Sequence, residues 1–111
     1  MRKSINIGGK DIEMLANGLT PVAYKRVFKK DFLAETQKED MDMTVFQELA
    51  FIMAMQCEKT DKEMMTGLTE EDYWTWLGGF GSMDIINEVD KVFAIFKASE
   101  KTASVPKKKP H

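Results

Sequence analysis

Apolar and polar residues alternate along residues 1–15 in the manner of a β-hairpin. Polar residues flank Ile5 and Ile7, and Ile12 follows after Gly8-Gly9. A glycine pair accepts the positive φ angles of a two-residue turn, so this segment predicts two antiparallel strands. Because an isolated hairpin is only marginally stable in water, we expect this one to pack against the rest of the chain.

The next apolar pattern has the spacing of a helix. Thr20-Pro21 is typical of a helix start, because threonine caps free backbone N–H groups and proline fits the first helical position. Three apolar residues follow at helical spacing and share one face: Tyr24, Val27 and Phe28. We expect this helix to fray over residues 31–34 and a polar linker to occupy residues 35–40.

The strongest helical pattern begins at residue 42 or 44 and ends at Cys57. Its apolar stripe is unbroken and consists of Phe46, Leu49, Ala50, Met53, Ala54 and Cys57. Thr44 and Gln47 fit a capping box at its start. Phe51 and Met55 add apolar surface outside the stripe. A helix that is apolar around most of its circumference is either central to the core or shared with another subunit.

A polar segment over residues 58–68 predicts a loop, and a short helix follows it. Thr69 is placed to cap this helix, whose first turn is acidic and therefore suits the positive end of the helix dipole. One side of the helix carries Tyr73, Trp76, Leu77 and Phe80, while Trp74 points elsewhere. Gly78-Gly79 is expected to end it.

The last helix is predicted to begin at Ser82, which serves as its cap. Its buried face is expected to carry Ile85, Ile86, Val89, Phe93 and Phe96. Beyond Ser99 the chain is short, basic and proline-bearing, which is typical of disorder. The pattern therefore predicts a mainly α (α+β) domain over residues 1–98, with about four helices and an N-terminal β-hairpin, and a disordered basic tail over residues 99–111.

Composition adds little to this fold but excludes several partners. The chain has 111 residues, the size of one domain, and a net charge of -2, which gives no general attraction to nucleic acid or anionic membranes. Asp84, Glu88 and Asp90 would also repel phosphates from the last helix. No apolar run is long enough to span a bilayer, and the N-terminus lacks the apolar stretch of a signal peptide, so we expect a cytoplasmic protein.

The chain is poor in the residues that carry catalysis or bind metals. His111 is the only histidine and Cys57 the only cysteine, so one chain cannot build a Cys–His pair or a zinc site of that type. The acidic residues near 40–42 lack the remaining ligands of a calcium loop, and the glycines at 78–81 lack the strand and lysine of a phosphate loop. We expect no enzyme activity and no cofactor.

Methionine and tryptophan indicate a protein that binds other polypeptides. The nine methionines include Met41, Met43, Met64 and Met65, which lie in predicted loops or at helix edges. Flexible thioethers suit a tolerant binding surface, although methionines also fill gaps in ordinary cores.

The two tryptophans of the short helix cannot face the same core. Trp74 and Trp76 are two positions apart, which is about 200° around a helix, so one of them is a candidate for an exposed anchor unless the helix is buried on both sides. The apolar surface candidates for partner binding are Phe51, Met55, Tyr73, Trp74, Trp76 and Phe80.

The order of these motifs resembles a known family. Ile5-Asn-Ile-Gly-Gly-Lys10, then Thr20-Pro-Val-Ala-Tyr24 and Phe28-Lys-Lys-Asp31-Phe, is similar to the opening of tail assembly chaperones from long-tailed phages of Gram-positive hosts. The apolar helix and the Trp76-Leu77 pair followed by Phe80 extend this resemblance over roughly residues 4–96.

The resemblance implies a chaperone for the tape measure protein. Such a protein acts in the host cytoplasm, is absent from the mature virion, and covers apolar helical segments of the tape measure protein until the tail tube forms. The resemblance also implies a homo-oligomer, because linked weak sites add avidity along a long ligand. The tail tube protein is a possible second partner. A longer product from ribosomal slippage near the lysines at 107–109 is a further implication, the alternative being a plain basic tail.

A different class of function remains open. A small regulatory adaptor or inhibitor would bind one folded partner through a fixed, polar-rimmed patch and stay monomeric. The chaperone requires self-association instead, and sizing by light scattering separates the two hypotheses.

Overall fold

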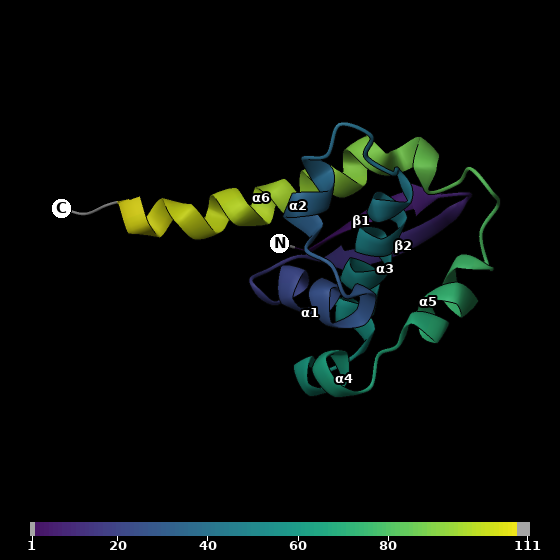
Figure 1. Ribbon diagram of the computed structural model, residues 1–111, viewed down its shortest axis with the longest axis horizontal. Helices are drawn as coiled ribbons and strands as arrows, with labels where there is room; N and C mark the ends of the chain where they lie inside the picture. The colour runs from purple at the N-terminus through teal and green to yellow at the C-terminus, as the bar shows by residue number, and fades with distance from the viewer. Residues whose placement is uncertain (1, 109–111) are drawn as a thin grey trace.

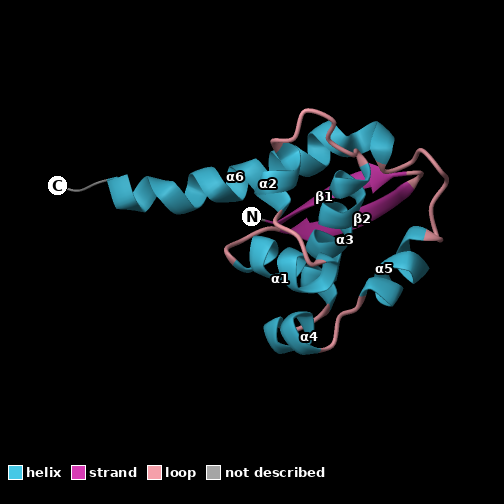
Figure 2. Cartoon of the chain, in the orientation of Figure 1, coloured by secondary structure: helices cyan, strands magenta, loops and turns pink. Residues whose placement is uncertain are grey.

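The computed structural model describes residues 2–108, with side chains as far as residue 99. Within this range two strands are followed by six α-helices and one short 3-10 helix (Figure 1): β1 (Arg2–Ile7), β2 (Lys10–Leu15), α1 (Leu19–Phe28), α2 (Phe32–Thr36), α3 (Thr44–Glu58), α4 (Asp61–Thr66), α5 (Glu70–Leu77), η1 (Ile86–Glu88) and α6 (Val89–Lys108). This confirms the mainly helical α+β fold with an N-terminal hairpin (Figure 2).

Helix α3 forms the centre of the core. It packs against β2 and against all the other α-helices, which surround it in Figure 1. Every residue from Val45 to Gln56 except Gln47 is buried. This explains why the helix is apolar around most of its circumference: neighbours of the same chain cover it on several sides.

The hairpin covers one side of α3. Ile5 pairs with Ile12 and Ile7 with Lys10 across the antiparallel ladder, and the turn between them has φ angles of 59° at Gly8 and 87° at Gly9. Ile5 and Ile7 of β1 and Met14 of β2 are buried, whereas Ser4, Asn6, Asp11 and Glu13 on the opposite face are exposed. The expected hairpin is therefore confirmed, and it packs on the helices as its marginal stability requires.

Buried polar contacts join α1 to α3. The Thr20 hydroxyl donates to Gln56 Oε1 at 2.6 Å, and the Tyr24 hydroxyl donates to Glu48 Oε1 at 2.6 Å. Thr20 lies inside α1, which already begins at Leu19, and its hydroxyl also accepts the Asn17 N–H at 3.0 Å. The expected role of Thr20 as a helix cap is wrong; its hydroxyl serves a tertiary contact.

The sequence pattern missed two short helices. Residues 31–36 do not fray: the Asp31 carboxylate accepts from two backbone N–H groups and caps α2, which buries Phe32. The segment expected to be a loop over residues 58–68 contains α4, begun by a capping box between Thr60 and Glu63. Both helices are too short to show an apolar stripe, since each buries one side chain.

Helix starts also differ in detail from the sequence pattern. Thr69 and Asp72 form a capping box at the start of α5, which ends at Leu77 before Gly78 as expected. Thr44 makes no such box; instead its N–H donates to Asp42 Oδ1 at 3.0 Å, which holds the pKa of Asp42 below its usual value. Ser82 does not cap α6, because η1 precedes that helix.

Helix α6 continues past the expected domain boundary at residue 98. Its backbone is helical to Lys108, and its second half projects beyond the body of the molecule (Figure 1). Val92, Ile95 and Phe96 are buried, while Val89 and Phe93 are half-buried. The side chains of residues 100–108 and all of residues 109–111 lie outside the described part, so the disordered basic tail stays a prediction.

Gly8→Ala is expected to lower the free energy of unfolding by about 2 kcal/mol, and Gly9→Ala by about 1 kcal/mol. Both positions have positive φ, so any side chain is strained there. A Cβ at Gly8 would also overlap the Asp84 carboxylate, which accepts from the Gly81 N–H at 2.7 Å, whereas a Cβ at Gly9 has nothing within 4 Å.

Urea unfolding of the two variants measures this difference. In an Asp84→Ala background the overlap is absent, so the two glycine substitutions should then cost nearly the same. An excess cost at Gly8 that persists without the Asp84 carboxylate would contradict the explanation.

Candidate functional site

The inner side of α5 is held in place by packed aromatic rings. We call Phe28, Phe51, Tyr73, Trp76 and Phe80 the aromatic cluster. The rings of Phe51 and Tyr73 lie 5.4 Å apart between centroids, and those of Trp76 and Phe80 lie 4.8 Å apart. Edge-to-face and tilted pairs at such distances add to the stabilisation from burial. The cluster therefore fixes one face of α5 against α3.

The hairpin tip secures the segment after α5. Lys10 Nζ donates to the backbone oxygen of Gly79 at 2.8 Å and lies 4.9 Å from the centroid of the Phe80 ring. A cation over an aromatic face is attracted by the ring quadrupole. The end of α5 is consequently tied to β2, which gives this short helix a defined orientation.

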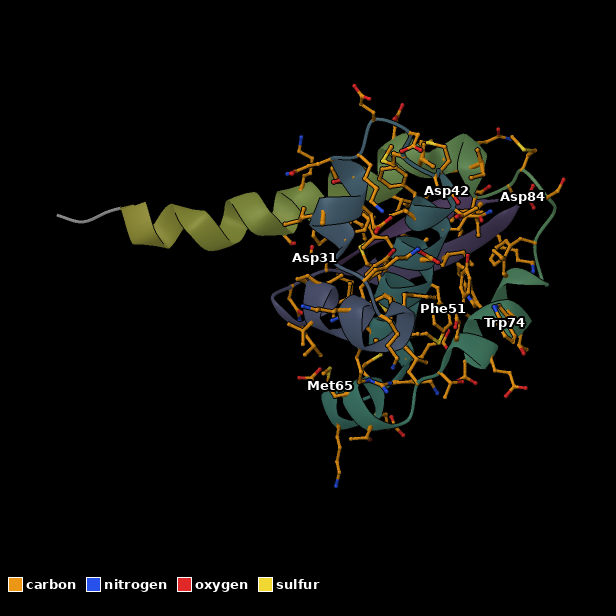
Figure 3. The ribbon with its side chains drawn as sticks, in the orientation of Figure 1. Asp31, Asp42, Phe51, Met65, Trp74 and Asp84 are labelled. Carbon is orange, nitrogen blue, oxygen red and sulfur yellow. The ribbon has the colours of Figure 1, made fainter. Side chains whose placement is uncertain are left out.

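The outer side of α5 is open and carries one large apolar residue. Trp74 is 60% exposed, and residues one turn away on the same face are Glu70, Glu71 and Gly78. We call this surface the Trp74 face. Figure 3 shows Trp74 on α5 at the margin of the molecule and Phe51 inside the body. The face combines an apolar anchor with an acidic rim.

The structure separates the six candidate residues into three groups. Phe51, Met55 and Tyr73 are buried, at 0%, 7% and 6% exposure, so the expectation that they form an apolar surface is wrong. Trp76 and Phe80 are half-buried within the aromatic cluster. Trp74 alone among the six is exposed. Phe51 and Tyr73 are covered because α3 and α5 face each other, which periodicity within one helix does not reveal.

Most of the methionines that the sequence suggested as a binding surface pack against the core instead. Met64 is fully buried, and Met41 and Met65 pack partly against the core. Met43 is 39% exposed and Met83, which the sequence did not single out, is 53% exposed. For Met64 the gap-filling explanation therefore holds, while Met43 and Met83 remain accessible.

Burial favours the neutral forms of Tyr24, Tyr73 and Cys57. Burial raises the pKa of Tyr73 to about 12, and burial together with the hydrogen bond to Glu48 raises that of Tyr24 further. Burial also raises the pKa of the Cys57 thiol, which is half-buried. A thiol with a raised pKa is a poor nucleophile at neutral pH. Over the part of the chain that is described, no three His, Cys, Asp or Glu side chains gather into a possible metal site.

A groove that the sequence did not indicate lies between β1 and α6. It has a volume of about 430 Å³, and its two walls are Lys3, Ser4, Ile5 and Asn6 of β1 and Lys91, Ala94, Ile95 and Ala98 of α6. The only trace of it in the sequence is the i, i+3, i+4, i+7 spacing of the α6 residues, which marks one helix face. We call it the β1–α6 groove.

None of the helices within residues 2–108 combines the length and apolarity needed to cross a membrane. Comparisons of the chain with models of protein families, with curated proteins and with solved structures give no match.

Proposed function

We propose that this protein binds another polypeptide through the Trp74 face. The observation that carries the proposal is the 60% exposure of Trp74 on a helix whose opposite side is anchored in the core. Exposing a large indole ring to water is unfavourable, and tryptophan is enriched among the residues that dominate binding energy in interfaces. Because the backbone beneath it is held by the aromatic cluster, little ordering is needed when a partner binds.

The chemistry of the face favours a helical partner with basic residues beside its apolar stripe. An exposed helix face with one anchor suits packing against an amphipathic helix. The acidic residues Glu70 and Glu71 lie one turn before Trp74 and would attract lysine or arginine side chains on the partner.

The resemblance to tail assembly chaperones supports a more specific role. We take the partner to be the tape measure protein, a long helix-rich chain that the protein keeps soluble in the host cytoplasm without becoming part of the virion. Self-association, and contact with the tail tube protein, belong to the same proposal. The family resemblance includes Trp76-Leu77 and Phe80, which pack against the core. These residues hold the side of α5 opposite the exposed Trp74.

Trp74→Ala is expected to weaken binding of the tape measure protein about tenfold or more, because it removes the single anchor of the face. Co-expression of the two proteins, followed by measurement of the soluble and co-purified tape measure protein, tests this. Trp74 is mostly exposed, so the variant should keep the circular dichroism spectrum of the unchanged protein.

Thr75→Ala is the matched control, since Thr75 is exposed on the same helix and contributes no large apolar surface. It should co-purify the tape measure protein like the unchanged chain. If the Trp74→Ala variant co-purified as much tape measure protein as the unchanged chain, Trp74 would not be the binding anchor. Failure of the unchanged chain to solubilise the tape measure protein would overturn the chaperone role.

The burial of α3 by the rest of the chain favours a second candidate function. This function is that of an adaptor or inhibitor of one folded protein. The apolar residues of α3 are buried by neighbours within the chain, so this helix offers no apolar face to share with another subunit. The exposed Trp74 with its acidic rim is left as a patch of the kind that an adaptor needs. Light scattering at high micromolar concentration distinguishes the two: an oligomer supports the chaperone, and a monomer supports the adaptor.

A further inference from the structure

The open edge of β1 presents backbone groups that can pair with another strand. In a hairpin with a two-residue turn, Ile7 and Lys10 form a hydrogen-bonded pair, and hydrogen-bonded and non-hydrogen-bonded pairs then alternate. Ser4 and Asn6 occupy non-hydrogen-bonded pairs with Glu13 and Asp11. Their N–H and C=O groups therefore point away from β2, toward the outer edge of the sheet.

The β1–α6 groove lies along this edge. Its strand wall runs over four consecutive residues from Lys3 to Asn6, which span about 10 Å at the rise of a β-strand. Its helix wall runs from Lys91 to Ala98, also about 10 Å at the helical rise. The two walls match in length, and Ala94 keeps the helix side shallow because its side chain is a single methyl group. The space suits three or four residues of an extended chain.

The charges along the groove are basic. Lys3 has no ion pair among the described residues, and Lys91 pairs only with Glu88, at 3.1 Å and in an exposed i, i+3 contact. Such exposed pairs contribute little stability, so they do not hold Lys91 against a competing carboxylate. Arg2, at the end of the same strand, is already paired with Glu13 at 3.2 Å. The lysines on both walls therefore favour an acidic occupant.

The geometry points to a second binding site, in which an extended acidic segment of another protein adds a third strand to β1 within the β1–α6 groove. Main-chain hydrogen bonds to Ser4 and Asn6 provide affinity, and carboxylates of the segment meet Lys3 and Lys91. The site is separate from the Trp74 face and uses a strand instead of a helix as its ligand. This second site does not depend on the proposed function of the Trp74 face.

A short synthetic peptide in which Glu and Val alternate serves as the probe. Fluorescence anisotropy with the full chain should detect binding, and the same peptide with Lys in place of Glu should bind at least about tenfold more weakly, because like charges then face the lysines. Amide hydrogen exchange should slow at Ser4 and Asn6 on binding and stay unchanged at Asp11 and Glu13, which lie on the other edge of the hairpin.

Variants of the groove sharpen the test. Lys91→Glu should weaken binding about tenfold or more, and Ala94→Phe should abolish it by filling the helix side. Lys97→Glu is the matched control: it makes the same charge change on α6 but lies outside the groove, over the Phe93 ring, and should leave binding unchanged. Circular dichroism confirms that each variant is folded.

Two outcomes would overturn the inference. One is that the Glu–Val peptide fails to slow exchange at Ser4 and Asn6, whether or not it binds. The other is slowed exchange at these amides that depends on the concentration of the protein alone, which would assign the edge to a second copy of this chain.

Discussion

Replacing Phe51 with alanine is expected to lower the free energy of unfolding by about 3–5 kcal/mol. Phe51 is fully buried, and its ring lies 5.4 Å from Tyr73, 5.6 Å from Trp76 and 6.4 Å from Phe28, so its removal leaves a cavity at the centre of the aromatic cluster. A loss of this size is a large part of the total stability of a small domain. Urea unfolding followed by far-ultraviolet circular dichroism measures it.

Trp74→Ala provides the comparison, because it removes a larger ring from the same region of the fold. Trp74 is exposed, and surface substitutions usually change stability by less than about 0.5 kcal/mol. Phe51→Leu, which fills part of the space, should fall between the two. If Phe51→Ala lowered the free energy of unfolding as little as Trp74→Ala does, Phe51 would not be part of the core. It would then again be a candidate for the binding surface.

Glu48→Ala is expected to cost about 2–4 kcal/mol of unfolding free energy. Glu48 is buried, at 8% exposure. Its carboxylate accepts a hydrogen bond from the Tyr24 hydroxyl at 2.6 Å and pairs with Lys30 Nζ at 3.1 Å. Alanine would leave the buried Tyr24 hydroxyl without its acceptor and Lys30 without its partner. Glu48→Gln keeps an acceptor oxygen for the hydroxyl, so it should cost only about 1 kcal/mol.

A double-mutant cycle separates the hydrogen bond from the loss of packing. Tyr24→Phe keeps the ring, which packs against Phe28 and Phe32, and removes the hydroxyl. In the Tyr24→Phe background the cost of Glu48→Ala should fall by about 1 kcal/mol or more, because no unsatisfied hydroxyl then remains. Strict additivity of the two substitutions in urea unfolding would show that the buried hydrogen bond does not contribute to stability.

The location of the candidate binding surface was predictable only in part. The angle between successive helical positions places Trp74 and Trp76 on different sides of α5, and the structure confirms this: Trp76 packs in the aromatic cluster and Trp74 lies outside it. The burial of Phe51 and Tyr73 was not predictable in the same way. It depends on α3 and α5 facing each other, and periodicity describes each helix alone.

The β1–α6 groove was not predictable from the sequence. Its walls come from opposite ends of the chain, Lys3 to Asn6 and Lys91 to Ala98. No local pattern relates residues so far apart, since their proximity results from the packing of α6 against β1 and α3. The hairpin predicts that an edge exists, but the space beside it follows from the position of α6.

By itself the sequence determined those helices and strands whose residue pattern repeats over a few neighbouring positions. The alternation of Ile5 and Ile7 around a glycine pair defines the hairpin, the stripe through Phe46 and Leu49 defines α3, and Thr69 marks the start of α5. Each of these depends on neighbours within a few positions, where backbone geometry alone decides which side chains share a face.

Only the tertiary structure decided which side chains meet water. Thr20 resembles a cap but serves a buried contact with Gln56, and Met55 resembles surface but is covered. Asp31 shows that a local signal can also be insufficient. Its side chain caps α2, but this helix has only five residues and is held in place by the packing of Phe32 on the core. Burial removes apolar area from water only where separate elements come together, so exposure is a property of the assembled fold and not of any single segment.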